Sequence, residues 1–207
     1  MFRAGRLFIV SAPSGAGKTS LVQKLVKQAS DVVASISHTT RKQRHGEIDG
    51  KDYFFISHDK FNQMVKTGKF IEHAKVFDNY YGTSLQSVRD LLQQGMKVIL
   101  EIDWQGARQV RTKMKNTTSI FILPPSEKEL ASRLRTRGQD SEEVITRRMS
   151  DAKSEISHYE EFDYIIINDD FDRAYQELSA FISNPERYLP FCLDNIRPLA
   201  LDILNRS

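Results

Sequence analysis

The chain has 207 residues, of which 40% are hydrophobic and 28% are charged, and its formal net charge is +3. This composition predicts a soluble globular protein, and so small a net charge gives no support to nucleic-acid or membrane binding. The lone cysteine, Cys192, excludes an intrachain disulfide and a cysteine-based zinc cluster. No run approaches the roughly 18 apolar residues of a membrane span. We therefore expect a cytoplasmic protein without nucleic-acid or membrane partners, and the sequence leaves a homo-oligomer open.

Short apolar runs alternate with helical patterns along most of the chain. Four runs are typical of buried parallel strands, at residues 7–10, 98–100, 119–123 and 164–167. Strands that alternate with helices imply a parallel sheet with helices on both faces, which is an α/β fold. We assign the core of this fold to residues 1–36, 84–130 and 149–184.

Two segments interrupt the alternation. Residues 37–83 contain many aromatic and basic residues and short strand-like pieces, which predict an inserted lobe with its own small sheet. Residues 131–148 are rich in arginine and glutamate and poor in bulky apolar residues, which predicts a helical lid. The tail, residues 185–207, ends in an apolar series that packs either on the core or on another subunit.

A glycine-rich loop joins the first predicted strand to an amphipathic helix. It consists of Ala12, Pro13, Ser14, Gly15, Ala16, Gly17, Lys18 and Thr19. Apart from alanine at the first position, this is the P-loop pattern, in which glycines let backbone N–H groups approach phosphate oxygens. Lys18 would bring positive charge to the β- and γ-phosphates, and Thr19 would offer a hydroxyl to Mg²⁺. A plain glycine-rich turn is the alternative, but the flanking strand and helix favour the P-loop, whose helix adds its positive dipole end.

Charged side chains elsewhere separate a small-molecule kinase from a GTPase or an ATPase motor. Glu101 and Asp103 follow a predicted buried strand, where a carboxylate can hold the Mg²⁺ shell, although acids at strand ends are also common surface charges. Arg41 and Arg44 could clamp the phosphate of an acceptor, or form a solvated basic loop. The predicted lid carries further arginines suited to charge developing on a transferring phosphoryl group. They are Arg133, Arg137, Arg147 and Arg148.

The sequence resembles guanylate kinase from about residue 5 to residue 183. The matching motifs are Ser11–Lys18, Ser37–Arg41, Gly46–Tyr53, Phe70–Glu72, Asn79–Thr83, Ile102–Gly106, Arg133–Gly138 and Val144–Arg148. The variant loop that opens with Ala12 is familiar in bacterial members. The resemblance implies transfer of the ATP γ-phosphoryl group to GMP and dGMP, with Mg²⁺ as cofactor.

The resemblance also implies roles for individual residues. The GMP phosphate would meet Arg41, Arg44, Tyr53 and Tyr81, and the guanine would meet Ser37, Glu72, Thr83 and Asp103. Arg133, Arg137 and Arg148 would close over ATP, Asn168 would contact its adenine, and Lys18, Arg41, Arg137 and Arg148 would act in catalysis. Thr19 and Glu101 would lie at the metal, where many relatives have aspartate in place of Glu101. Without the resemblance, Tyr53 and Tyr81 would be ordinary sheet aromatics.

Three alternatives remain open at this point. A guanylate-kinase-like scaffold binds phosphorylated partners without catalysis, but such modules typically lose the P-loop lysine or the lid arginines. Here Lys18, Thr19, Arg137 and Arg148 are all present. A kinase for another nucleoside monophosphate and a kinase for a different small phosphate ester are the other two. Guanine offers N–H donors that suit the acceptors Glu72 and Asp103, which favours GMP over adenine nucleotides.

Overall fold

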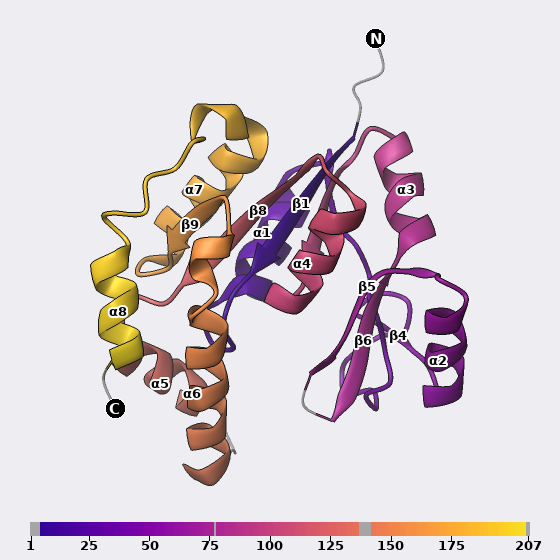
Figure 1. The fold of residues 1–207 in the computed structure, drawn as a ribbon, viewed down its shortest axis with the longest axis horizontal. Coiled ribbons are helices and arrows are strands. Elements are labelled where there is room, and N and C mark those ends of the chain that lie inside the picture. The colour runs from indigo at the N-terminus through magenta and orange to yellow at the C-terminus, as the bar shows by residue number, and fades with distance from the viewer. Residues whose placement is uncertain (1–4, 77, 137–141, 206–207) are drawn as a thin grey trace. The chain divides into compact units, whose positions relative to one another are not determined.

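The computed structural model describes residues 5–76, 78–136 and 142–205, and these form two compact units (Figure 1). Unit 1 comprises the residues up to Phe8 together with Ser30–Thr117. Unit 2 comprises Ile9–Ala29 and the residues from Thr118 onward.

The five strands of one sheet are distributed over both units. Its order is β2 (Val32–Ala34), β7 (Lys97–Glu101), β1 (Arg6–Ser11), β8 (Thr117–Leu123) and β9 (Tyr164–Ile167). The pairs β2–β7 and β8–β9 are parallel, which confirms the predicted α/β fold with a parallel sheet. All four predicted strands are present. The short strand β2 was not predicted, because three residues are too few to show a pattern.

A four-stranded sheet lies within unit 1 and comes from the segment predicted as a lobe. Its order is β4 (Phe54–Phe55), β3 (His38–Thr39), β6 (Asn79–Ser84) and β5 (Phe70–Val76). Three helices complete the unit, namely α2 (His58–Lys66), α3 (Leu85–Gln93) and α4 (Trp104–Lys113). Helix α2 packs beside β5 through the fully buried Phe61, whose ring centroid lies 4.7 Å from that of Phe70. Helix α4 also packs against β5.

Unit 2 is mainly helical. Its helices are α1 (Lys18–Gln28), α5 (Glu127–Thr136), α6 (Glu142–Ile156), α7 (Phe171–Ser183) and α8 (Arg197–Asn205), with short 3-10 turns η1 (Tyr159–Glu161) and η2 (Pro185–Arg187). Helix α1 buries Leu21, Val22 and Leu25, as its pattern predicts, and packs on α7. Helix α8 packs on α6 and buries Ala200 and Ile203, so the described part of the tail packs within its own unit.

The segment predicted as a lid, residues 131–148, contains parts of two helices, α5 and α6. Helix α5 begins at Glu127, and helix α6 continues beyond residue 148 to Ile156. The two helices pack side by side in unit 2, as Figure 1 shows. Residues 137–141, which include the predicted catalytic Arg137, lie outside the described residues.

The strands β1 and β8 are deeply buried. Phe8, Ile9, Ile120 and Phe121 have no exposed surface, which explains why these strands read as continuous apolar runs. In the part of the chain that the structure describes, no helix combines the length and the apolar character needed to cross a membrane.

Candidate functional site

The glycine-rich loop lies in unit 2 between β1 and α1. Gly15 and Gly17 have φ angles of +94° and +93°, a backbone conformation that favours glycine. A Cβ atom on Gly15 would lie 2.9 Å from Leu134 Cδ2. Helix α1 begins at Lys18, and among the described residues no side chain caps this helix start. The first N–H groups of the helix are therefore suited to an anion, and Thr19 is exposed in the same turn.

Asn168 braces the glycine-rich loop from the end of β9. Its side chain is buried, and its Nδ2 donates a 2.7 Å hydrogen bond to the carbonyl oxygen of Ala16. A Cβ atom on Gly17 would lie 2.4 Å from the same nitrogen. The backbone carbonyl of Asn168 accepts a hydrogen bond from Arg133 Nη2 at 3.0 Å. Asn168 therefore contacts the glycine-rich loop, which its predicted adenine role did not include. Through its backbone carbonyl, Asn168 also links Arg133 to this loop.

Helix α6 holds the glycine-rich loop at Ser14. Arg148 Nη2 donates to the Ser14 hydroxyl at 2.9 Å, and the Ser14 backbone N–H donates to Glu155 Oε2 at 3.1 Å. Arg148 and Glu155 are seven residues apart, which places them on one face of the helix. Sequence reasoning identified Arg148 but missed Glu155. The only signal in the sequence was its spacing from Arg148.

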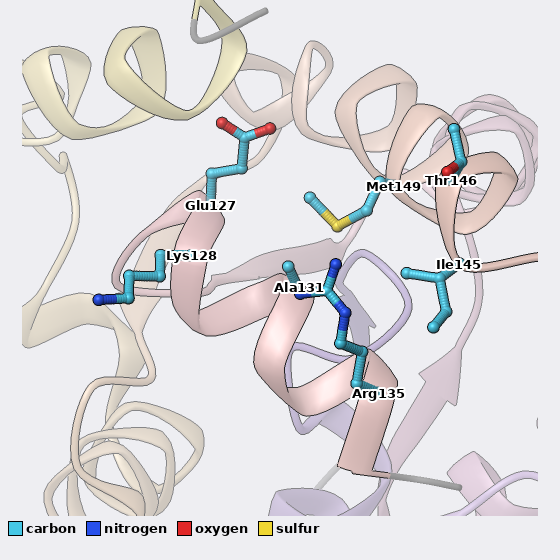
Figure 2. A pocket seen from close by; sticks show the side chains of 7 residues that line it. All are labelled: Glu127, Lys128, Ala131, Arg135, Ile145, Thr146 and Met149. Carbon is cyan, nitrogen blue, oxygen red and sulfur yellow. The ribbon is translucent and has the colours of Figure 1, made fainter. Parts of the chain in front are cut away.

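A separate hollow of about 430 Å³ lies between α5 and α6. Figure 2 shows Ala131 and Arg135 of α5 on one side and Ile145 and Met149 of α6 on the other. The full lining is Glu127, Lys128, Ala131, Arg135, Ile145, Thr146 and Met149. Neither Arg133 nor Arg148 belongs to this lining, so the hollow is distinct from the glycine-rich loop.

Three of the four residues predicted to meet guanine form a hydrogen-bonded chain in unit 1. The Thr83 hydroxyl donates to Glu72 Oε1 at 2.5 Å and lies 3.1 Å from the Ser37 hydroxyl. Glu72 and Thr83 are only 3% and 1% exposed. Asp103 is the N-cap of α4, where its Oδ1 accepts from the Gly106 N–H at 2.8 Å.

The electrostatics of Glu72 differ from those of a surface carboxylate. The pKa of Glu72 is raised to about 7, chiefly by burial and also by the negative charge of Asp103. The hydrogen bond from Thr83 and the positive charge of Lys113 oppose this rise in the pKa. A buried carboxyl that titrates near neutrality is a strong candidate for a functional group.

The residues predicted to meet the GMP phosphate form a second cluster in unit 1. Arg41 lies 5.5 Å from the ring centroid of Tyr53, and the rings of Tyr53 and Tyr81 are 6.0 Å apart. The Arg44 side chain is exposed. Glu101 contributes to raising the pKa of Tyr53, after burial and Tyr81, so its charge also acts at this cluster.

Glu47 completes the phosphate cluster and was not assigned a role from the sequence. Its two carboxylate oxygens accept hydrogen bonds from Arg41 at 2.6 and 3.1 Å, and Oε2 also accepts from the Arg44 N–H at 2.8 Å. The hydrogen bond from Arg41, followed by that from Arg44, lowers the pKa of Glu47. The lowered pKa keeps the glutamate ionised at neutral pH, as a partner of the Arg41 guanidinium.

Comparisons with known proteins agree on one family. The family model described as guanylate kinase matches residues 4–185. A guanylate kinase of Alkalilimnicola ehrlichii is 56% identical over 199 residues, which cover 94% of this chain and 98% of the relative. A guanylate kinase of Escherichia coli K12 is 57% identical over 180 residues, covering 86% and 87% of the two chains. A crystal structure of guanylate kinase from Anaplasma phagocytophilum has a TM-score of 0.72 and 34% identity, covering 96% and 95%. The chain belongs to the guanylate kinase family.

Proposed function

We propose that this protein transfers the γ-phosphoryl group of ATP to GMP, and to dGMP, giving ADP and GDP or dGDP. The names of its relatives support this reaction. The observation that carries the choice of acceptor is the buried Glu72 carboxyl, 3% exposed and hydrogen-bonded to Thr83. Guanine presents N1–H and 2-amino donors to such an acceptor, whereas adenine would leave buried carboxylate lone pairs unpaired.

The acceptor phosphate belongs, in this proposal, with Arg41, Arg44, Tyr53 and Tyr81. Glu47 fixes the Arg41 guanidinium, and the neighbouring rings of Tyr53 and Phe55 support it at 5.5 and 5.7 Å. An arginine held in this way loses little entropy when it binds a phosphate, so its hydrogen bonds contribute more of their strength. Because the acceptor phosphate is already anionic, the reaction needs positioning and charge stabilisation more than a strong base.

ATP belongs with the glycine-rich loop of unit 2. The uncapped start of α1 supplies N–H groups, and Lys18 supplies positive charge for the β- and γ-phosphates. Arg148 already lies at the loop through its hydrogen bond to Ser14. We assign Arg133, Arg137 and Arg148 to the phosphoryl group in transfer and Asn168 to both the adenine and the loop.

The oxygen donors suit magnesium. Mg²⁺ prefers oxygen ligands, retains several waters, and is usually held by one or two protein groups together with substrate phosphates. The hydroxyl of Thr19, an exposed residue in the first turn of α1, is such a donor, and Glu101 at the end of β7 is our second assignment. When bound, Mg²⁺ would neutralise charge on the β- and γ-phosphate oxygens.

The alternatives are less well supported. A scaffold would not need a phosphate-binding lysine, and the chain retains Lys18 together with Thr19 and Arg148. A kinase for AMP would not favour the buried acceptor Glu72, because adenine has an acceptor at N1 and no 2-amino group. The cytoplasmic location stays a prediction, and a homo-oligomer stays open.

One experiment tests the reaction directly. ADP release should be measured with ATP and Mg²⁺ against GMP, dGMP, AMP, CMP and UMP in turn. We expect strong stimulation by GMP and dGMP and little by the other three nucleotides. No stimulation by GMP would overturn the proposal, and equal stimulation by AMP would overturn the role of Glu72 in selectivity.

A further inference from the structure

Strand β5 contains an extra residue immediately before Glu72. Phe70 pairs with Ser84 of β6, but Glu72 pairs with Thr83, so two steps along β5 match one step along β6. The extra residue, Ile71, forms a β-bulge. Because side chains alternate between the faces of a strand, a shift of one residue changes which side chain faces a given partner. The bulge therefore sets the register that places Glu72 opposite Thr83, its hydrogen-bond donor.

Lys113, the last residue of α4, holds the bulge. Its Nζ donates to the carbonyl oxygen of Ile71 at 2.6 Å and to that of Phe70 at 3.2 Å. Ile71 is fully buried, and a buried carbonyl group is costly unless it has a hydrogen-bond partner. The lysine thus stabilises the irregular part of the strand, and its charge also favours the ionised form of Glu72.

Gln109, one turn earlier on α4, holds the strand on the other side of Glu72. Its Nε2 donates to the His73 carbonyl at 2.7 Å, and its Oε1 accepts from the His73 N–H at 3.1 Å. This side-chain amide pairs with both backbone groups as a neighbouring strand would. Since β5 is the edge strand of its sheet, helix α4 occupies the place of the missing neighbour.

The first turn of α4 meets the Glu72 carboxylate itself. A Cβ atom on Gly106 would lie 2.9 Å from Glu72 Oε2, so only glycine permits this approach. The same turn begins at its N-cap, Asp103, the second predicted guanine acceptor. Helix α4 and its N-cap therefore supply three things. They supply the second predicted guanine acceptor, Asp103, the glycine turn against which Glu72 packs, and the two side chains that hold the strand on either side of Glu72.

We propose that Lys113 and Gln109 are positioning residues for guanine recognition. By holding the bulged strand to α4, they fix Glu72 relative to Asp103 and so set the preference for a purine with a 2-amino group. Neither residue needs to touch the nucleotide. This inference rests on the proposed GMP kinase function.

The test compares Lys113→Met and Gln109→Met with the wild type, using GMP and IMP as acceptors. IMP keeps the N1–H of guanine but lacks the 2-amino group. We expect the KM for GMP to rise about tenfold in each variant, the size of one charge-assisted or well-made hydrogen bond. The ratio of kcat/KM for GMP to that for IMP should fall severalfold, while the KM for ATP stays within about twofold.

Lys115→Met is the matched control, because it removes the same charge two residues further on, from an exposed position. This control should leave kcat/KM for GMP and for IMP unchanged. Lys113→Arg keeps a donor and should recover part of the GMP preference. Thermal unfolding of each variant shows whether it is folded at the assay temperature.

Two outcomes would overturn the inference. One is an equal loss for GMP and IMP, with their ratio unchanged, in a folded Lys113→Met or Gln109→Met enzyme. The other is the same loss in the Lys115→Met control. Failure of the proposed function itself looks different, since the wild type would then show no GMP-stimulated ADP release.

Discussion

The Glu47 carboxylate accepts two hydrogen bonds from the Arg41 guanidinium, with distances of 2.6 and 3.1 Å. It also accepts a hydrogen bond from the backbone N–H of Arg44, which lies three residues after Arg41 in the chain. Glu47 thereby fixes the orientation of the Arg41 guanidinium relative to the backbone at Arg44, the second predicted phosphate ligand. Salt screens this pair less than an exposed ion pair, because both side chains are mostly covered, at 13% and 20% exposure.

Loss of the Glu47 carboxylate should weaken GMP binding without affecting ATP. In Glu47→Ala the Arg41 side chain is no longer oriented, so we expect the KM for GMP to rise about tenfold and the KM for ATP to stay within about twofold. Initial-rate kinetics in both substrates give the two constants. Asp59→Asn, which removes a charge from the exposed start of α2, is the control and should be silent. An unchanged KM for GMP in Glu47→Ala would show that Arg41 needs no such partner.

The pH dependence of GMP use should report Glu72. Its pKa, raised by burial to about 7, means that the carboxyl is largely protonated below this pH in the absence of substrate. Guanine donors require the carboxylate, so GMP binding at lower pH must release a proton. The KM for GMP should therefore rise as pH falls below about 7, by up to about tenfold per pH unit.

Glu72→Gln isolates this effect, because the amide does not titrate and the second ionisation of the GMP phosphate is common to both enzymes. Above about pH 8 the two pH profiles should have the same slope. The variant's KM for GMP should still be higher than the wild type's at every pH in this range. The KM for ATP should be similar in both. Parallel profiles for the wild type and the variant would contradict the assignment.

The sequence predicted those parts of the protein whose structure depends on near neighbours. The strand, glycine turn and helix around Lys18 are contiguous, so local pattern and backbone freedom sufficed. The apolar strands β1 and β8 were visible because both of their faces are buried. The family resemblance then brought together Glu72 and Thr83, which the structure links by a hydrogen bond.

Other features depend on contacts between distant segments, and no local pattern signals them. Glu155 is 141 residues from Ser14, and Asn168 is 152 residues from Ala16. The bulge at Ile71 looks like ordinary strand sequence, because the extra residue is apolar and only the partner strand shows the shift in register. Long-range braces of this kind become visible only once the chain is folded.

Lys18→Met should abolish most turnover while leaving the fold intact. The lysine is half-buried at the first residue of α1, and the substitution removes a phosphate contact but keeps the apolar stem. We expect kcat to fall by at least about a hundredfold, as when other charge-stabilising donors are removed. Lys27→Met, in the last turn of the same helix, is the matched control. Wild-type turnover in Lys18→Met would remove the basis for the phosphate-binding assignment.

Asn168→Ala should distinguish a loop brace from an adenine contact. Loss of the buried 2.7 Å bond to Ala16 leaves a carbonyl unpaired, and we expect the free energy of unfolding to fall by about 1–3 kcal/mol. If Asn168 acts mainly through the loop, the KM values for ATP and for GTP as donors should rise by the same factor. If it acts mainly through adenine, only the KM for ATP should rise. Denaturant unfolding and donor kinetics measure the two effects separately.

Helix α6 holds Ser14 at two points. Arg148 binds its hydroxyl and Glu155 its backbone N–H, so the position of the loop and the position of this arginine are linked. Glu155→Ala should raise the KM for ATP and lower kcat, because Ser14 loses its backbone contact with α6 and Arg148 is then held less precisely at the loop. Glu155→Gln keeps an oxygen acceptor and should retain most activity. We expect the alanine variant to lose about tenfold in kcat/KM for ATP, the value of one hydrogen bond to a charged group. Glu143→Ala, exposed on the same helix, should be neutral. A double-mutant cycle of Glu155→Ala with Ser14→Ala and Arg148→Ala tests the linkage, since additive losses would mean that the two contacts act independently.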